Sequence, residues 1–590
     1  MTKKTAMPER IEMLRALMRA KGWDAVVVLG SDPHCSEYPA ERWKQVEWLS
    51  GFTGEAGDLV VTLDHAGLWT DTRYFIQAKQ QLAHTGVELH KMRVPEHIPI
   101  PEWLGMALGD DALIAVDGLC AGADFTKSLP GTVISVPDLL SRFWTDRPAI
   151  PQTPVVTVDP GESRGQKLAW IRRFLEKNDC DGILLTALDE IAWMLNVRAS
   201  DIEYNPLVIS YLLITREDVV WYVLKQEVED PDSRGTFELL ATEGIRLLPY
   251  EDVGLLASEF QGRLYVDVST LNYQLYDNLT AAGIPLEEGI SPVGARKAVK
   301  NGEEIAGMRK AHLQDGIAME RFLYWLEKSV EAGREITEWD AAVKLGQLRA
   351  DQPDYLGDSF ETISAYGPGA ALPHYVTPHY HAPVIRDEGL YLCDSGGQYN
   401  CGTTDITRTV PMGRCSALEC EDYTLVLKGH IALAMAVFPE GTPGCRLDVL
   451  SREPLWRCKR NFGHGTGHGV GWYLGVHEGP QDIRQNLNPV PFQAGMITSD
   501  EPGIYREGLY GVRHENLLLC TGAGETEFGR WLCFETLTLC HFDTGILVRD
   551  LLSREETDWL NAYHERVYRT LSPHLPPEIA AWLRGKTQAI

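Results

Sequence analysis

The alternation of hydrophobic and polar residues is similar in two segments of the first half of the chain. Each segment begins with an amphipathic helix pattern, "LRALMRAKGWD" in one and "IRRFLEKNDCD" in the other, and continues with a short apolar strand. A Trp-Leu or Trp-Met element and a second strand follow, so that Asp24 aligns with Asp181 and Leu59 with Leu212. Recurrence of this order predicts a duplicated α/β domain.

Two further stretches predict where the first copy gives way to the second and where the duplicated part ends. The proline-rich residues 145–160 are typical of a linker between the two copies. Asn301 and Glu304 form a capping-box pattern ahead of a long helix that reaches past Trp325. From about residue 355, glycine-rich turns alternate with short β-rich runs. We therefore predict two tandem α/β domains, 1–152 and 153–298, followed by a third domain, 299–590.

Composition and charge limit the possible partners. The chain has 590 residues, 44% of them hydrophobic and 23% charged, which is typical of a globular protein with more than one core. Its formal net charge of −28 argues against nucleic acid or an anionic membrane as the main partner, because phosphate binding requires clustered Lys and Arg. No run is apolar enough for a membrane span.

The N-terminal residues and the cysteines predict a cytoplasmic protein. Residues 1–24 have no unbroken apolar core, since Glu9 and Glu12 interrupt it, and they favour an amphipathic helix over a signal peptide. The twelve cysteines include no C-x-x-C pair. An even number could indicate disulfides in a secreted protein, but without a signal peptide reduced and mostly buried thiols are expected.

The first candidate chemistry lies in "GLYLCDSGGQYNCGTTDITRTV", where two strand-like runs flank a glycine-containing turn. A hairpin centred between Tyr399 and Asn400 would place Asp394 directly opposite Asp405, with Cβ atoms about 5 Å apart. Two carboxylates in this arrangement repel unless a cation lies between them. The alternative is a pair of turn aspartates that cap backbone amides.

A second pair of carboxylates flanks a later turn. Glu501 and Glu515 are nearly symmetric about Gly508, and Glu515 enters an apolar strand. Burial of a carboxylate is costly unless it is paired, hydrogen-bonded or bound to a metal. The alternative for Glu515 is a buried ion pair with Arg513. His514 alternates with Glu515 along the strand and is expected to point away from it.

Between these pairs lies "NFGHGTGHGVGWYLGVHEGP", with glycine at every second position from Gly463 to Gly471. Five glycines disfavour a helix, each by about 1 kcal/mol. On an extended path His464 and His468 would lie about 13 Å apart, too far to bind one ion together. One of them is a metal ligand at most, and the glycines would let the backbone run close under a crowded site.

The set of two aspartates, two glutamates and one histidine is rich in oxygen. It is suited to two divalent ions with bridging carboxylates, because four negative ligands balance two doubly charged cations. Oxygen dominance favours Mn²⁺, although Co²⁺, Fe²⁺ or Zn²⁺ could also bind.

The order Asp, eleven residues, Asp, then His, Glu and Glu resembles that of the pita-bread metallopeptidases. The segments "DSGGQYNCGTTDITRTV", "GHGTGHGVGWYLGVHEGP" and "DEPGIYREGLYGVRHENLLL" look like those of the long, three-domain Xaa-Pro aminopeptidases of the cytosolic type, as do "EYPAERWKQVEWLSGFTGEAG" and "TALDEIAWMLNVRASDIEYNP". "FETLTLCHFDTGIL" extends the resemblance almost to the end of the chain. It implies two creatinase-like domains and a C-terminal pita-bread domain.

The resemblance also implies roles for individual residues. The implied metal ligands are Asp394, Asp405, His468, Glu501 and Glu515. The implied catalytic residues are His374, His464, His477 and Glu501, and Glu501 resembles the proton acceptor for the attacking water. The implied substrate-binding residues are His374, His464, His477 and Arg513. The family further implies a homodimer formed through the C-terminal domain.

The function expected from these residues is hydrolysis of the peptide bond before proline in second position, with release of the first residue. The substrates would be peptides that begin Xaa-Pro, and two divalent ions would be the cofactors. Two alternatives share the fold. A prolidase would have every ligand but accept dipeptides alone, and a non-catalytic pita-bread binding module would lack some ligands, whereas all five are present here.

Overall fold

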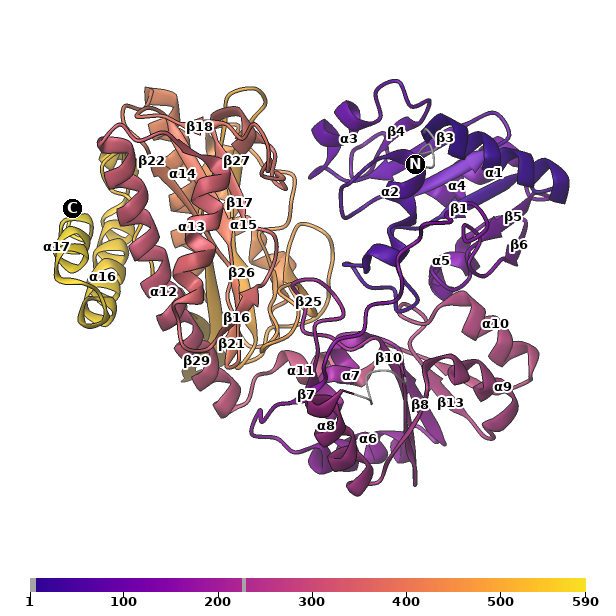
Figure 1. Ribbon diagram of the computed structural model, residues 1–590. Coiled ribbons are helices and arrows are strands. Elements are labelled where there is room, and N and C mark those ends of the chain that lie inside the picture. The colour runs from indigo at the N-terminus through magenta and orange to yellow at the C-terminus, as the bar shows by residue number, and fades with distance from the viewer. Residues whose placement is uncertain (1–6, 225–229) are drawn as a thin grey trace. The chain divides into compact units, whose positions relative to one another are not determined.

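The computed structural model describes residues 7–224 and 230–590 (Figure 1). The chain divides into two compact units, Met1–Val293 and Gly294–Ile590, and the division falls inside helix α11 (Pro292–Ala298). Both units mix helices and strands, in agreement with the predicted α/β class.

The first unit contains two six-stranded sheets with related strand orders. In sheet order, the first sheet consists of β4 (Glu88–Lys91), β3 (Ala66–Thr70), β2 (Asp58–Thr62), β1 (Ala25–Val28), β5 (Leu113–Val116) and β6 (Thr132–Ser135). The second consists of β12 (Ile245–Pro249), β11 (Val219–Val223), β10 (Ser210–Thr215), β8 (Gly182–Leu185), β13 (Leu264–Val266) and β14 (Leu286–Glu288). The two orders are equivalent strand by strand, which confirms the predicted duplication.

The registers of the two sheets agree with the sequence alignment. Leu59 pairs with Val28 across β2 and β1, and Leu212 pairs with Leu185 across β10 and β8. The aligned aspartates also have the same role. Asp24 exchanges backbone and side-chain hydrogen bonds with Leu113, and Asp181 makes the same two contacts with Arg263.

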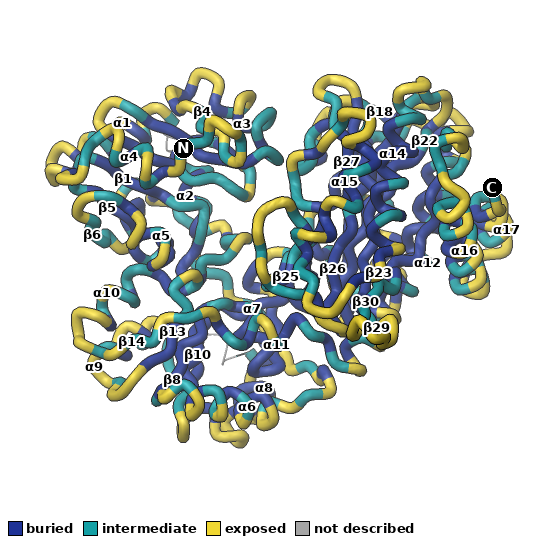
Figure 2. The backbone as a smooth tube through the Cα atoms, turned by 180° about the vertical axis from the view of Figure 1, so that it is seen from behind, coloured by how far each residue is buried: buried dark blue, intermediate teal, exposed yellow. Residues whose placement is uncertain are grey.

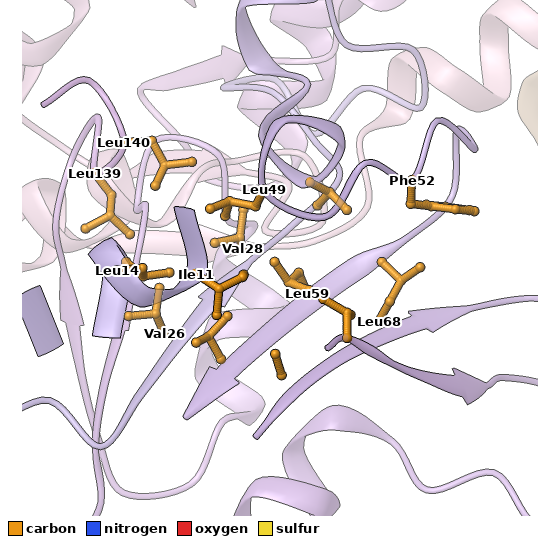
Figure 3. Close-up of a cluster of buried hydrophobic side chains, with 14 of the residues drawn as sticks. Ile11, Leu14, Val26, Val28, Leu49, Phe52, Leu59, Leu68, Leu139 and Leu140 are labelled. Atoms are coloured by element: carbon orange, nitrogen blue, oxygen red, sulfur yellow. The ribbon is translucent and has the colours of Figure 1, made fainter. Parts of the chain in front are cut away.

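Helices of the first unit cover the sheets through apolar faces. They are α1 (Met7–Lys21), α2 (Gln45–Ser50), α3 (Phe75–Gln81), α4 (Ile100–Leu108), α5 (Ala123–Ser128), α6 (Arg164–Lys177), α7 (Leu188–Leu195), α8 (Pro231–Thr242), α9 (Leu256–Glu259) and α10 (Tyr273–Ala281). In Figure 3, Ile11 and Leu14 of α1 and Leu49 of α2 pack beside Val26 and Leu59 of the sheet. The N-terminal amphipathic helix is thus present from Met7, and residues 1–6 lie outside the described part.

Buried polar groups join the two α/β halves of the first unit. His34 Nδ1 donates to the Thr186 carbonyl at 2.9 Å, and His34 Nε2 lies 3.0 Å from the Tyr250 hydroxyl. Asn272 Nδ2 donates to the Pro33 carbonyl at 2.9 Å. Hydrogen bonds of this kind, completely removed from water, make the halves one compact unit. The predicted domain boundaries at 152/153 and 298/299 stay predictions.

The second unit is built around antiparallel strands. A central sheet consists of β17 (Ile363–Tyr366), β19 (Leu390–Ser395) and β22 (Ile406–Pro411), and a six-stranded sheet of β23 (Val437–Pro439), β30 (Gly529–Thr536), β29 (Asn516–Thr526), β26 (Ile497–Asp500), β24 (Gly467–Gly469) and β25 (Glu478–Ile483). Smaller ladders pair β15 (Ile336–Thr337) with β18 (Val384–Ile385), β27 (Gly503–Arg506) with β28 (Tyr510–Arg513), and β20 (Gly397–Tyr399) with β16 (Tyr355–Asp358) and β21 (Gly402–Thr403).

Helices pack on these strands and on one another. They are α12 (Gly302–Glu331), α13 (Glu338–Ala350), α14 (Ala417–Ala434), α15 (Asp448–Arg457), α16 (Arg554–Leu571) and α17 (Pro577–Lys586). The predicted capping box is present at the start of α12, where Asn301 and Glu304 satisfy each other's backbone amides. Phe322 of α12, Leu345 of α13 and Tyr391 of β19 share one core cluster. Figure 2 shows burial concentrated along the strands and exposure along α16 and α17.

Two predictions concern membranes and thiols. Within residues 7–224 and 230–590, no helix has the length and apolar character that crossing a membrane requires. All twelve cysteines lie in this part of the chain and are free thiols. The expectation that most are buried is wrong, because five are buried, six are partly exposed and Cys458 is exposed.

Candidate metal centre

The two aspartates lie on one hairpin, but in a different register from the one predicted. Tyr399 pairs with Gly402, so the turn consists of Asn400 and Cys401, and Asp394 pairs with Thr407 instead of Asp405. The turn thus lies one residue later than expected. Asp405 becomes the diagonal neighbour of Asp394 on the same face of the ladder, still within reach of a shared ion.

The register of the two glutamates is as predicted. Gly503 pairs with Arg513 in the β27–β28 ladder, and Asp500 pairs with Asn516 in the β26–β29 ladder. Glu501 and Glu515 lie opposite each other between these two ladders. Glu515 donates its backbone amide to the Thr407 carbonyl at 3.1 Å, which brings the second pair of carboxylates against the first hairpin.

The glycine-rich segment adds His468 to the carboxylates. Strand β24 covers only Gly467–Gly469 of the expected extended path, and His464 precedes it in irregular backbone. A Cβ atom at Gly467 or Gly469 would collide with a carbonyl oxygen of the neighbouring strands. The glycines therefore allow the close approach of three strands, and His468 stands between β25 and β26.

Potential ligand atoms from these segments converge. Three overlapping groups, each with all its ligand atoms within 4.8 Å, consist of Asp394, Asp405 and Glu515; of His468, Glu501 and Glu515; and of Asp405, His468 and His477. His468 Nε2 lies 3.5 Å from both Asp405 Oδ2 and Glu501 Oε1. Because Asp405 and Glu515 each belong to two groups, the arrangement is that of two adjacent cation positions with shared carboxylates.

Burial and like charge perturb the acids of this cluster. Burial, and then repulsion by Asp394, raise the pKa of Asp405 to about 8. Burial, and then Asp405, raise the pKa of Glu515 well above its ordinary value. The pKa of Glu501 is also raised, mainly by burial, although His468 opposes the shift. The protein thus holds acids together at an electrostatic cost that bound cations would remove.

The donor atoms fit divalent cations. Asp394 Oδ1 is buried and has no hydrogen-bond partner among the residues that the structure describes, as expected for an oxygen reserved for a metal ion. His468 Nδ1 donates to the Gly469 carbonyl at 3.0 Å, so its Nε2 carries the lone pair that points at the carboxylates. Four carboxylates and one imidazole are the donors that Mn²⁺ and similar ions accept.

Sequence reasoning missed three residues that orient the cluster. Thr407 Oγ1 donates to Glu515 Oε2 at 2.8 Å, and Ser499 Oγ donates to Glu501 Oε1 at 3.2 Å. The Tyr505 hydroxyl lies 2.7 Å from His464 Nε2. Thr407 lies two residues after Asp405 and Ser499 two before Glu501, so strand alternation was a usable signal for both. Tyr505 had no such signal.

Arg513 pairs with an aspartate of the cluster and not with the glutamate two residues after it in sequence. Its guanidinium forms an ion pair with Asp394 and donates to the Tyr505 hydroxyl at 2.8 Å. The alternative prediction, a buried ion pair between Glu515 and Arg513, is therefore wrong. The Arg513 side chain is only 3% exposed, and its substrate-binding role stays a prediction.

His464 belongs to a chain of hydrogen bonds beside the carboxylates. Its Nδ1 donates to the Gly465 carbonyl at 2.7 Å, so Nε2 accepts from Tyr505. Burial, and then the charge of Arg513, hold the pKa of His464 well below its ordinary value, which keeps the ring neutral. His464 is absent from the three ligand groups, whereas His468 belongs to two of them.

The other two predicted histidines also lie at this site. The ring of His477 packs 4.3 Å from that of His468 and joins one ligand group. His374 follows the 3₁₀ turn Gly367–Ala371 and is close enough to lower the pKa of His464. The next residue, Tyr375, donates to the carboxylate of Glu338 at 2.7 Å, which ties the loop to α13.

His514 points away from the cluster, as strand alternation predicts. It is buried between Tyr423 and Phe542, whose ring centroids lie 4.4 and 5.4 Å from its own. His514 therefore contributes to packing behind the strand.

Comparisons with known families match almost the entire chain. Residues 306–522 match metallopeptidase family M24, and residues 530–590 match the C-terminal region of that peptidase family. Residues 10–135 and 146–304 each match a creatinase/prolidase N-terminal domain. The two sheets of the first unit lie in these two matched regions, and all the candidate ligands lie in the M24 region.

Individual relatives are similar over their full length. The chain is 37% identical to aminopeptidase P1 of Arabidopsis thaliana, with 99% of both proteins covered. It is 40% identical to the probable Xaa-Pro aminopeptidase P of Verticillium alfalfae, with 98% of the chain and 99% of the relative covered. Among solved structures, the X-prolyl aminopeptidase of Caenorhabditis elegans, described as a cytosolic enzyme with a di-nuclear active site, superposes with a TM-score of 0.94 at 35% identity, over 99% of this chain and all of that one.

Proposed function

The chain belongs to metallopeptidase family M24, and from this premise we propose that it is an Xaa-Pro aminopeptidase. It hydrolyses the bond between the first residue and a proline in second position, and releases the first residue. Similarity to proteins named for this activity extends over 98% or more of the chain.

One observation supports this function above the others. Asp394, Asp405, His468, Glu501 and Glu515 converge from three separate segments, and the buried Asp394 Oδ1 has no protein partner. A non-catalytic module has no reason to keep five ligands and to bear the repulsion between their carboxylates.

We propose that this cluster holds two divalent ions, with Mn²⁺ as the native metal. Asp394, Asp405 and Glu515 would hold one ion, and Asp405, His468, Glu501 and Glu515 the other. The oxygen-rich donor set supports Mn²⁺ over softer metals. When bound, two such metal ions supply Lewis acidity at the scissile carbonyl and lower the pKa of water.

The side chains of the protein would position the reactants and move the proton. Glu501 is oriented by Ser499, so it is suited to accept the proton of the attacking water. His477, beside His468, is placed to donate a hydrogen bond to the oxyanion that develops on the carbonyl. Neutral His464, held by Tyr505, would bind the peptide backbone.

The preference for proline would come from the loop that carries His374. A proline nitrogen has no N–H and its ring fixes φ, so proteases that bind an extended strand accept it poorly. Tyr375 and its contact with Glu338 hold this loop in place next to His464. We propose that His374 and the aromatic residues around it form the pocket for the proline ring.

Peptide cleavage tests the proposed function. Purified protein with added Mn²⁺ is given a tripeptide Xaa-Pro-Pro, the dipeptide Xaa-Pro and a matched tripeptide Xaa-Ala-Pro. We expect release of the first residue from Xaa-Pro-Pro, little from Xaa-Ala-Pro, and loss of activity with a chelator. Cleavage of the dipeptide alone would instead indicate a prolidase, and no chelator-sensitive cleavage would indicate a non-catalytic binding protein.

We also propose that the chain is a cytoplasmic homodimer. The solved relative is described as a cytosolic enzyme, which supports the compartment. The dimer rests on the family resemblance, and light scattering of the purified protein at micromolar concentration tests it. A mass of 65.9 kDa would show a monomer and contradict the dimer.

A further inference from the structure

A second cluster of potential metal ligands lies in the first unit, in the N-terminal half of the chain. His65 belongs to the turn between β2 and β3, and Glu88 and His90 belong to β4, the edge strand of the first sheet. Ligand atoms of these three residues all lie within 4.8 Å of one another. We call them the edge cluster. They play no part in the proposed peptidase reaction.

The distance between the two imidazoles is that of two ligands of one ion. His65 Nε2 and His90 Nε2 lie 3.2 Å apart. Two nitrogens that bind one tetrahedral zinc at about 2.0–2.1 Å are separated by about 3.3 Å. Glu88 Oε2 lies 4.0 Å from His65 Nδ1, and its side chain is 74% exposed, so it can turn toward the ring nitrogens and solvent metal can reach it.

The backbone and two tryptophans keep the rings in this arrangement. Gly67 lies beneath both imidazoles, and a Cβ atom there would come within 2.7 Å of His65 Nε2 and of His90 Nε2. The ring of His90 stacks on Trp69 with centroids 3.8 Å apart, and the ring of His65 lies 4.8 Å from that of Trp103. Packed rings lose little entropy when they bind an ion.

The donor types of the cluster also favour a cation. A neutral ring offers a lone pair, and Glu88 contributes the negative charge. Without a metal, the two nitrogens can share at most one hydrogen bond.

We propose that His65, Glu88 and His90 bind one first-row transition-metal ion of the zinc type, with water completing its coordination. Two imidazoles and one carboxylate with an open position are typical of such ions and not of Mg²⁺ or Ca²⁺. The ion would connect the β2–β3 turn to the edge strand β4. It would thereby stabilise the exposed side of the first sheet.

Zinc content of the full-length protein tests the site. Protein loaded with Mn²⁺ is incubated with Zn²⁺, passed through a desalting column and analysed by elemental mass spectrometry. The amount of zinc that enters the proposed catalytic site is the same in wild type and variants. The difference in zinc content therefore measures binding at the edge cluster. We expect wild type to retain one zinc per chain more than the His65→Asn/His90→Asn double variant. The control His84→Asn, an exposed histidine outside the cluster, keeps the wild-type content.

Two single variants sharpen the test, and the first of them avoids the risk of misfolding. Glu88→Gln changes an exposed side chain, and Gly67→Ala removes no ligand but pushes the rings apart. Each should weaken zinc binding about tenfold or more and leave peptidase turnover unchanged. Equal zinc content in wild type and all variants would overturn the proposal and leave a hydrogen-bonded histidine pair only.

Discussion

The two ligand clusters of this protein differ in burial and in charge. The proposed catalytic cluster gathers four carboxylates and one histidine in the interior, where burial, and then repulsion by Asp394, raise the pKa of Asp405 to about 8. The edge cluster has two partly exposed imidazoles and one exposed carboxylate. The comparison indicates that burying like charges together costs free energy that only bound cations offset. The edge cluster carries no such cost.

The largest effect is expected when a ligand of the buried cluster is removed. Asp394→Asn should lower retained metal and turnover by at least about 100-fold, because even outer partners of metal ligands contribute 10–100-fold. Metal content and kcat measure both effects. Asp387→Asn, an exposed aspartate before the same strand, is the matched control. Full metal content in Asp394→Asn would contradict the assignment.

Metal removal should make the stability of the protein depend on pH. The folded state of the metal-free protein holds protons on Asp405, Glu515 and Glu501 that the unfolded chain has already lost. Stability therefore falls as pH rises from about 4, the pKa of an unfolded carboxylate, to about 8, by a few kcal/mol in total. Thermal unfolding at several pH values measures this slope, and Mn²⁺ should abolish it. A metal-free protein that is most stable at pH 8 would refute the argument.

Loss of His464 should separate chemistry from metal binding. We expect His464→Ala to keep its metal and to lose about 100-fold in turnover, because the ring contacts Tyr505 and not the carboxylates. Elemental analysis with steady-state kinetics distinguishes this result from the one for Asp394→Asn. His574→Ala, on an exposed 3₁₀ turn, should change neither quantity. Equal metal loss in the His464 and Asp394 variants would make His464 a ligand.

The smallest effect is expected at Tyr505. Tyr505→Phe removes the hydroxyl that joins Arg513 to His464, and turnover should fall about tenfold with metal content unchanged. Because His464 would then lose its partner, KM should change as well as kcat. Tyr568→Phe on α16 serves as the control. Wild-type kinetics in Tyr505→Phe would mean that the contact with the Gly465 carbonyl is enough to hold His464 in place.

Much of the fold could be predicted because the sequence patterns that indicate it involve residues close together in the chain. The pattern shared around Asp24 and Asp181 predicted two equivalent sheets, and the symmetry about Gly508 predicted the register of Glu501 and Glu515. The exact register of the hairpin that contains Asp394 could not be predicted. Its turn contains Asn400, which favours turns, and Cys401, which does not, and glycines lie on both sides of it, so more than one register was possible and tertiary contacts decided between them.

The sequence by itself determined the periodicities, the capping box of α12 and the kinds of ligand present, since these depend on neighbours a few residues apart. Only the tertiary structure decided that Arg513 pairs with Asp394, that His34 and Asn272 join the two α/β halves, and that His65 meets His90 across Gly67. Each of these contacts depends on which strands lie side by side. That choice minimises exposed apolar surface and unpaired buried polar groups over the whole unit, and no short segment contains the information.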